Sequence, residues 1–240
     1  MKDIRVLAIN PGSTSTKIAV YQNTEPVFIK NIKHTTEELA PFAKITDQFQ
    51  FRKEIILRQL SEADIHLNDL QAVVGRGGLL KPIPSGIYEV NETMAADLVN
   101  SPLGEHASNL GGLIARDLVS SMPNARAYIV DPIVVDEFDD IARISGHPLL
   151  QRISIFHALN QKAVAREYAR SIRKKYEELN LIVVHLGGGI TIGAHQKGRV
   201  IDVNQGLDGE GPFSPERTGT LPVMDLVRLC FSGKYTLKEV

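Results

Sequence analysis

The chain has 240 residues, of which 43% are hydrophobic and 23% are charged, so it can bury a sizeable core. Its 27 basic and 28 acidic residues give a formal net charge of -1, which provides no general attraction to nucleic acid or to an acidic membrane surface. The single cysteine, Cys230, cannot form an internal disulfide, and we expect it to pack as a small hydrophobe. No apolar run is long enough to span a bilayer and no signal peptide is recognised, so we expect a cytoplasmic protein.

The first part of the chain predicts an antiparallel meander. Two β-prone segments, Ile4 to Asn10 and Lys17 to Tyr21, flank the polar loop Pro11 to Ser15, which is typical of a hairpin. A third strand is predicted at Val27 to Ile32.

Helix and strand patterns then alternate. Strands are predicted at Leu70 to Val74, Ala127 to Val130, Leu181 to Leu186 and Ile190 to Ala194, and helices at Phe51 to Ala63, Ala107 to Ser121 and Ala158 to Leu179. The last helix is expected to pack on a sheet through one stripe: Leu159, Ala163, Val164, Ala169, Ile172, Tyr176 and Leu179.

The order strand, glycine-containing turn, strand occurs twice, once after Asn10 and once at Gly187 to Gly189. We infer two related domains, residues 1–150 and 151–240, with the boundary near 146–152. Thr236 and Glu239 have the spacing of a capping box, which indicates a helix starting there and a second domain that is incomplete. A frayed polar tail is the alternative.

The first turn is a candidate phosphate-binding loop. Its glycine and hydroxyl residues could direct backbone amides and hydroxyls at a polyanion. It is not a Walker loop, because Thr16 stands where a glycine should precede Lys17, and a strand follows. A polar hairpin loop without a ligand is an open alternative.

The second turn has three consecutive glycines, which weaken a hairpin unless a ligand or another backbone segment must come close. A second phosphate-binding turn fits this pattern, and a bulged hairpin is the alternative. Arg76 and Arg217 lie in glycine-containing turns, where a guanidinium could bind an oxyanion or could simply be solvated.

Two further residues could carry chemistry. His157 stands at the start of a predicted helix, where an imidazole could meet developing negative charge, although a packed or capping histidine fits as well. Asp131 follows a predicted strand and could hold Mg2+ through water, or could be an ordinary turn aspartate. The seven histidines show no zinc-ligand spacing.

Taken together, these segments resemble the acetokinase family, within the superfamily of sugar kinases and actin-like ATPases, over almost the whole chain. Asn10 to Lys17 resembles the first phosphate motif of the family and Val183 to His195 the second. Arg152 and His157 have the family's arginine-to-histidine spacing. The resemblance implies an α/β fold with two ribonuclease-H-like, actin-like ATPase domains around a cleft.

The resemblance also implies roles for individual residues. Arg76 and Arg217 would bind the carboxylate or acyl phosphate, His157 would stabilise the transferring phosphoryl group, and Asp131 would orient Mg2+ together with Asn10. His106 matches another histidine of the family's active site and would bind substrate. The residues implied to bind the nucleotide are Asn10, Gly12, Ser13, Thr14, Ser15, Lys17, His185, Gly187, Gly188 and Gly189.

The implied activity is reversible phosphoryl transfer between ATP and a short-chain carboxylate, with ADP and an acyl phosphate as products and Mg2+ as cofactor. Pro11, Gly188 and the run Gly77 to Gly86 favour the branch of the family that acts on butyrate. A kinase for acetate, propionate or a branched-chain acid is one alternative, and a non-catalytic actin-like nucleotide-binding module is another. The resemblance implies a homo-oligomer, and the family's adenosine-binding motif would lie after Val240.

Overall fold

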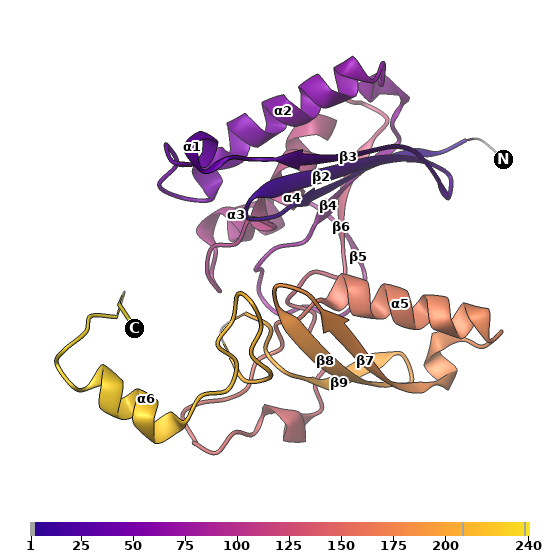
Figure 1. Cartoon of the computed structure of the whole chain (residues 1–240). Coiled ribbons are helices and arrows are strands. Elements are labelled where there is room, and N and C mark those ends of the chain that lie inside the picture. The colour runs from indigo at the N-terminus through magenta and orange to yellow at the C-terminus, as the bar shows by residue number, and fades with distance from the viewer. Residues whose placement is uncertain (1–2, 208, 238) are drawn as a thin grey trace. The chain divides into compact units, whose positions relative to one another are not determined.

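The computed structural model describes residues 3–207, 209–237 and 239–240 and divides into two compact units. Unit 1 is Met1–Asp136 and unit 2 is Glu137–Val240 (Figure 1). This division lies earlier in the sequence than the expected boundary near 146–152, because residues 137–152 associate with the second unit. Each unit is described separately.

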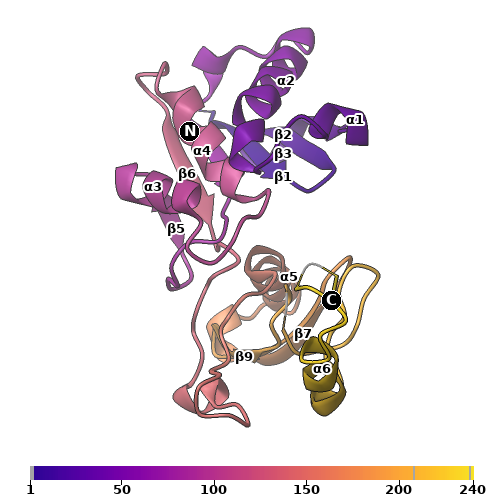
Figure 2. The same cartoon turned by 90° about the vertical axis from the view of Figure 1, so that its left-hand side faces the viewer.

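Unit 1 contains a six-stranded sheet with the order β3-β2-β1-β4-β6-β5. The predicted meander is confirmed, because β1 pairs with β2 and β2 with β3 in antiparallel fashion. β1, β4 and β6 are parallel neighbours, and β3 and β5 form opposite edges (Figure 2). The strands are β1 (Arg5–Pro11), β2 (Ser15–Gln22), β3 (Glu25–Lys33), β4 (Ala72–Arg76), β5 (Ile87–Glu89) and β6 (Arg126–Val130).

Helix α4 packs closely on the centre of this sheet, against β4 and β6. A Cβ on Gly75 of β4 would lie 2.1 Å from the carbonyl oxygen of Gly111 in α4, so only glycine allows this approach. The predicted helices of this unit are confirmed, while α1 and α3 were not predicted. The helices are α1 (Thr36–Leu39), α2 (Phe49–Glu62), α3 (Glu92–Asn100) and α4 (Asn109–Val119), with short 3-10 turns at Thr46–Gln48 and Leu67–Asp69.

Unit 2 contains a second antiparallel meander, with the strand order β7-β8-β9. Its strands are β7 (Asn180–Leu186), β8 (Ile190–Gln196) and β9 (Arg199–Val203), and its helices are α5 (Ala158–Ser171) and α6 (Val223–Cys230). Short 3-10 turns occur at Asp140–Arg143 and Tyr176–Glu178. Ala165, Ala169 and Tyr176 form a small core on which Leu181 and Val183 of β7 pack.

The prediction for α5 was wrong in its end and in its buried stripe. The helix ends at Ser171 because Arg173 adopts a left-handed conformation (φ 56°) and the amide of Lys174 donates to the carbonyl of Ala169. Leu159 and Val164, expected to be inward, are exposed. The buried positions are Ala158, Gln161, Lys162, Ala165 and Ala169, which share one face at helical spacing.

Cys230 also differs from the prediction. It is exposed at the end of α6, a helix in which no residue is buried. The expected capping-box pair is in contact, since the amide of Thr236 donates to Glu239 Oε2 over 2.9 Å. No helix among the described residues is both long and apolar enough to cross a membrane.

Candidate functional site

In unit 1, three predicted site residues lie at the carboxyl ends of neighbouring parallel strands. Ile9 pairs with Gly75 in register, and Arg76 pairs with Val130, so Asn10, Arg76 and Asp131 lie at the same edge of the sheet. The carboxyl ends of parallel strands are the usual place for a ligand site in such sheets. Arg76 Nη1 lies 3.4 Å from Asn10 Oδ1, and burial lowers the pKa of the Arg76 guanidinium.

The backbone carbonyl groups of the first turn point toward the interior of unit 1, where they accept hydrogen bonds. Arg52 of α2 donates to the carbonyl oxygens of Ser13 (3.2 Å) and Ser15 (3.1 Å), and the amide of His34 donates to that of Thr14 (2.9 Å). Carbonyl oxygens repel phosphate, so their inward orientation favours an anion at the outer side of the turn. Lys17 is the cross-strand partner of Asn10 and therefore projects from the same face.

Arg52 is a buried cation beneath this turn. Its side chain is fully buried, and its guanidinium also contacts Thr16 Oγ1 (2.9 Å) and Gln48 Oε1 (2.8 Å). Every acceptor named here is neutral, and burial lowers the pKa of Arg52 to about 10. His34 is buried beside it, and burial followed by the charge of Arg52 lowers the pKa of His34.

The oxygen atoms at this edge suit a hard divalent cation. Asp131 is buried, and its Oδ1 accepts hydrogen bonds from Ser85 Oγ (2.5 Å) and the amide of Gly86 (2.9 Å). A carboxylate and the amide oxygen of Asn10 are ligand types that Mg2+ accepts while it keeps several waters. The donor set therefore fits Mg2+ held partly through water. No cluster of three or more His, Cys, Asp or Glu side chains that could hold a metal occurs in the described part of the chain.

His106 lies in the segment that leads into α4. Its Nδ1 accepts from the amide of Ser108 (3.2 Å) and lies 2.7 Å from the Ser108 hydroxyl. Asn109, in the first turn of α4, binds the loop that follows Arg76, because its Oδ1 accepts a hydrogen bond from the amide of Leu79 (2.8 Å). Substrate binding by His106 stays a prediction.

In unit 2, two histidines are gathered at the base of the second turn. His185 and Thr191 are cross-strand partners on β7 and β8. His157, at the N-terminus of α5, stacks on His185 with ring centroids 3.8 Å apart, and its Nδ1 lies 3.0 Å from Thr191 Oγ1. A Cβ on Gly189 would lie 3.3 Å from His157 Cε1, so the imidazole lies directly against the glycine turn.

The loop that carries Arg217 packs on the same turn. The Ser214 hydroxyl donates to the carbonyl of Gly188, and a Cβ on Gly188 would lie 2.8 Å from the Glu216 carboxyl carbon. Arg217 Nη1 donates to the carbonyl of Glu216 over 2.7 Å. Arg217 Nε is buried and has no hydrogen-bond partner among the described residues, so the guanidinium retains capacity to bind an anion.

Sequence reasoning missed several polar residues that support these turns, chiefly Arg52, Gln161 and Thr191. A signal for two of them was available. Arg52 shares the buried face of α2 with Ile55, Ile56 and Leu60, and Gln161 shares that of α5 with alanines. A polar side chain at an inward helical position needs a buried partner, which marks it as a candidate site residue.

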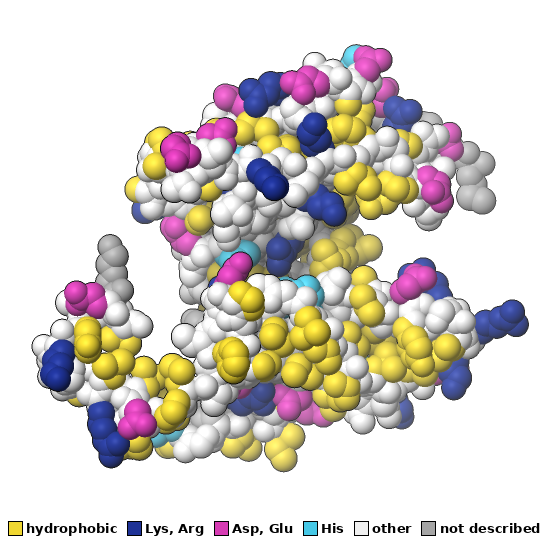
Figure 3. All heavy atoms as spheres, viewed as in Figure 1, with side chains coloured by type: hydrophobic (Ala, Val, Ile, Leu, Met, Phe, Trp, Pro, Cys, Tyr) yellow, Lys and Arg dark blue, Asp and Glu magenta, His cyan; other side chains and the backbone are white. Residues whose placement is uncertain are grey.

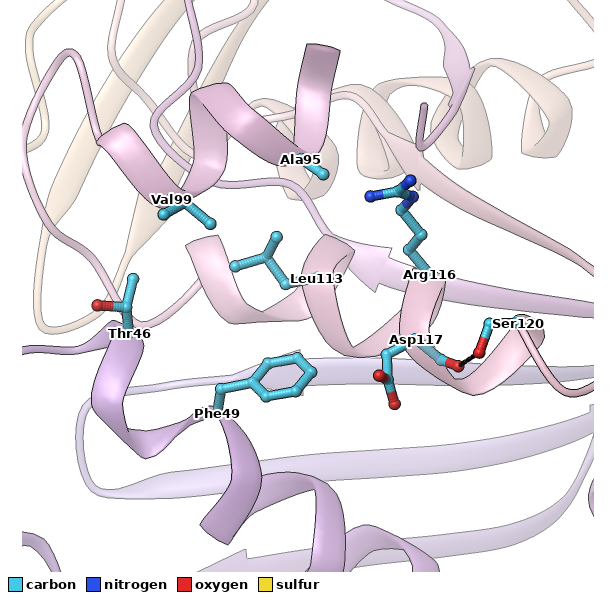
Figure 4. A pocket seen from close by; sticks show the side chains of 8 residues that line it. All are labelled: Thr46, Phe49, Ala95, Val99, Leu113, Arg116, Asp117 and Ser120. Atoms are coloured by element: carbon cyan, nitrogen blue, oxygen red, sulfur yellow. Dashed lines mark hydrogen bonds between the residues drawn. The ribbon is translucent and has the colours of Figure 1, made fainter. Parts of the chain in front are cut away.

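Unit 1 also has an open groove of about 540 Å³ (Figure 4). Phe49, Val99 and Leu113 form its apolar wall, and Arg116 and Asp117 lie on α4 beside it. The predicted catalytic and nucleotide-binding residues are absent from the lining of this groove. We therefore treat two regions as candidate sites, each within its own unit: the sheet edge with the first turn in unit 1, and the second turn in unit 2.

Comparisons with known proteins agree with the sequence resemblance. A sequence model described as "Acetokinase family" matches residues 148–221. The chain is 61% identical to "Butyrate kinase 1" of Clostridium acetobutylicum over 98% of its own length and 66% of that protein. It is 56% identical to "Probable butyrate kinase" of Bacteroides thetaiotaomicron, over 99% of this chain and 67% of the relative. The chain thus spans about two thirds of the length of the curated relatives it matches.

Solved structures confirm the predicted α/β fold class. The structure is similar to "Crystal structure of Porphyromonas gingivalis acetate kinase", with a TM-score of 0.73 at 18% sequence identity, covering 98% of this chain and 66% of the other. It is also similar to a propionate kinase from Francisella tularensis, with a TM-score of 0.66, 18% identity and the same coverage. At this identity the likeness concerns the fold.

Proposed function

The chain belongs to the acetokinase family, and on that premise we propose that it takes part in reversible phosphoryl transfer between ATP and a short-chain carboxylate, with butyrate as the acid. The observation that carries the proposal is the arrangement at the second turn, where the imidazole of His157 and the loop of Arg217 both pack on consecutive glycines. Relatives named as butyrate kinases, at 56–61% identity, support the choice of acid.

In this reaction a carboxylate oxygen of the acid attacks the γ-phosphorus of ATP. The bond between that phosphorus and the oxygen bridging to the β-phosphate breaks, and its electron pair leaves with ADP. A carboxylate is already deprotonated, so no general base is needed, and the protein contributes positioning and charge stabilisation.

The residues of both units suit these tasks. In unit 1 the first turn would bind phosphate oxygens through Gly12 to Ser15 and Lys17, because its carbonyls are tied to Arg52 and His34. Arg76 would bind the carboxylate or the acyl phosphate, since a partly buried guanidinium binds oxyanions in a forked geometry.

In unit 2 the backbone of Gly187 to Gly189, which carries no side chains of its own, would approach the polyphosphate. His157 would donate a hydrogen bond to the transferring phosphoryl group, and Arg217 would bind its developing charge. Asn10 and Asp131 would hold Mg2+, which when bound would neutralise charge on the phosphates.

The test is acyl-phosphate formation, trapped as the hydroxamate, by the protein expressed from its complete gene. With ATP and hydroxylamine we expect more product from butyrate than from acetate, propionate or isobutyrate, although one methylene changes binding by only about 1–3 kcal/mol. ATP binding without hydroxamate from any of these acids would overturn the proposal in favour of a nucleotide-binding module.

The same assay tests Arg217. Arg217→Ala should lower turnover about 100- to 1,000-fold, the usual cost of losing one charge-stabilising donor, while the melting temperature stays close to that of the wild type. Arg228→Ala is a matched control, because Arg228 lies on the surface of α6 and bonds to Asp225. Near-normal turnover by Arg217→Ala would remove this arginine from the mechanism.

A further inference from the structure

A chain of hydrogen bonds runs from His157 into the interior of unit 2. Thr191 Oγ1 lies 3.0 Å from His157 Nδ1 and 2.8 Å from Gln161 Nε2. Gln161 Oε1 lies 2.9 Å from His195 Nε2, and His195 Nδ1 lies 2.6 Å from the hydroxyl of Tyr176. All four supporting residues are buried: Thr191, Gln161, His195 and Tyr176. Each of their polar side-chain atoms must therefore form its hydrogen bond with another atom of the protein.

The direction of these bonds is set by one backbone group. The carbonyl oxygen of Thr191 can only accept, and it lies 3.0 Å from Gln161 Nε2, so the amide group of Gln161 must present its NH2 to Thr191. Gln161 Oε1 then faces His195 and accepts from the Nε2–H of that ring. His195 Nδ1 is left as an acceptor, and the Tyr176 hydroxyl donates to it.

The direction of the hydrogen bonds also determines which group donates between Thr191 and His157. Thr191 Oγ1 already accepts from Gln161, and the other contact of this hydroxyl among the described residues is His157 Nδ1. Because the hydroxyl is buried, its proton is satisfied only by donation to His157 Nδ1. We propose that the buried chain of Thr191, Gln161, His195 and Tyr176 fixes neutral His157 as the tautomer with its proton on Nε2. Thr191 and Gln161 are therefore positioning residues.

The sequence builds this chain through the two-residue period of β8. Thr191, Gly193 and His195 lie on the same buried face of the strand. A Cβ at the middle position would lie 2.3 Å from Gln161 Oε1 and 3.0 Å from His195 Nε2, so Gly193 leaves the space that the Gln161 amide occupies. The hydrogen-bond chain thus accounts for a glycine inside a strand, where glycine otherwise costs stability.

The tautomer decides what His157 can do in the proposed phosphoryl transfer, on which this consequence rests. A Cβ on Gly189 would lie 3.3 Å from Cε1 and 3.7 Å from Nε2 of His157, so the Nε2 edge of the ring lies against the glycine turn. With the proton on Nε2, a neutral His157 presents a donor at that edge. The opposite tautomer would present a lone pair, which repels a phosphoryl oxygen.

The direct test is the tautomeric state of His157, measured by long-range proton–nitrogen NMR correlation at pH 8 on the 15N-labelled chain. We expect a neutral ring with the proton on Nε2, and His195 in the same form. A His157→Gln variant assigns the signal. An Nδ1-protonated or doubly protonated His157 in the wild type would overturn the proposal. This measurement needs no substrate, so it stands apart from the test of the proposed function.

Two variants of Thr191 test whether its hydroxyl sets the tautomer of His157. Thr191→Val keeps the shape but removes the hydroxyl, and we expect His157 to lose its single tautomer, while Thr191→Ser should keep it. Gln196→Leu, on the exposed face of the same strand, is the matched control. In the phosphoryl-transfer assay Thr191→Val should lower kcat at least about tenfold with little change in the KM for ATP, and Thr191→Ser should restore it.

Gly193→Ala gives an independent disturbance of the chain, because its Cβ would displace the Gln161 amide. It should also allow His157 to adopt both neutral tautomers, although the atoms that the added Cβ would meet first belong to Gln161 and His195. An unchanged, single Nε2–H tautomer in folded Thr191→Val and Gly193→Ala proteins would show that the chain does not set the tautomer.

Discussion

At the scale of single residues, the setting of His195 links the buried hydrogen-bond chain to pH. Burial, and then the charge of Lys162, lower the pKa of His195 from 6.5 to about 4. Between these values the unfolded chain binds a proton that the folded protein does not bind. The contribution of this pKa shift to the free energy of unfolding should therefore be complete above pH 6.5. It should be lost as the pH drops to about 4, which lowers the free energy of unfolding by about 2–4 kcal/mol.

Urea unfolding at several pH values measures this effect, with His195→Gln as the test variant. The variant should lose part of the pH dependence that the wild type shows between pH 6.5 and 4. His66→Gln is the control, because His66 is exposed and contacts Asp64 only at the surface. Equal pH dependence in the wild type and in His195→Gln would mean that His195 is protonated in the folded protein.

Local sequence signals locate the strand ends on which several candidate residues lie. The clustering of Asn10, Arg76 and Asp131 at one sheet edge follows from their positions at strand ends, which alternation of apolar residues locates. Arg52 and Gln161 were missed because their partners are distant in sequence, such as Ser15 and Thr191. Their inward position on a helix was visible, but only the fold shows which atoms they meet.

At the scale of elements, the contact between α4 and β4 depends on glycine. A Cβ on Gly111 would lie 2.5 Å from the carbonyl oxygen of Arg76, so Gly111→Ala must push α4 away from the strand end that carries this arginine. Helix propensity alone would favour alanine by about 1 kcal/mol. We expect overpacking to prevail, with a net loss of about 1–3 kcal/mol in the free energy of unfolding by urea.

Gly146→Ala is the matched control, since an added Cβ there meets no atom within 4 Å. Loss of stability in both variants to the same extent would contradict the clash at Arg76 as its cause, because the effect of alanine on the unfolded chain alone would raise the free energy of unfolding. A gain in stability for Gly111→Ala would show that α4 can retreat without cost, and the close approach would then have no structural role.

Elements were predictable where their residues have one clear periodicity. The hairpins and α2 follow this rule, and their observed bounds differ from prediction by about two residues. The stop of α5 was not visible, because apolar residues continue at helical spacing to Leu179 while Arg173 breaks the helix through its backbone conformation. The short strands β5 and β9 were missed for lack of a repeating pattern.

At the scale of the whole molecule, the two units use the same meander but differ in what lies next to it. In unit 1 the edge of β1 that faces away from β2 pairs with the parallel strand β4, and α4 packs against both β1 and β4. β7 is the corresponding strand of unit 2, and in the described residues β8 is its sheet partner. One face of this sheet is left apolar and solvent-exposed, with Ile182 and Leu186 each at least 70% exposed.

This apolar face should make the 240-residue chain self-associate, because exposed apolar patches of this kind favour contact with other surfaces. Hydrophobic side chains gather over β7 and β8 (Figure 3), and Val184 and Ile192 enlarge the patch. Ile182→Thr combined with Leu186→Thr keeps residues suited to strands. We expect the double variant to bind less of a hydrophobic dye and to sediment as a smaller species than the wild type.

Val27→Thr combined with Ile29→Thr is the control for this last prediction. These two side chains on β3 are about as exposed as Val184, at 53% each, and charged residues lie beside them in the sequence at Glu25 and Lys30. If the patch on β7 and β8 drives association, only the variant of β7 changes the sedimentation. An equal effect of both variants would assign association to total exposed apolar area, and no effect of either would show that this face is stable in water by itself.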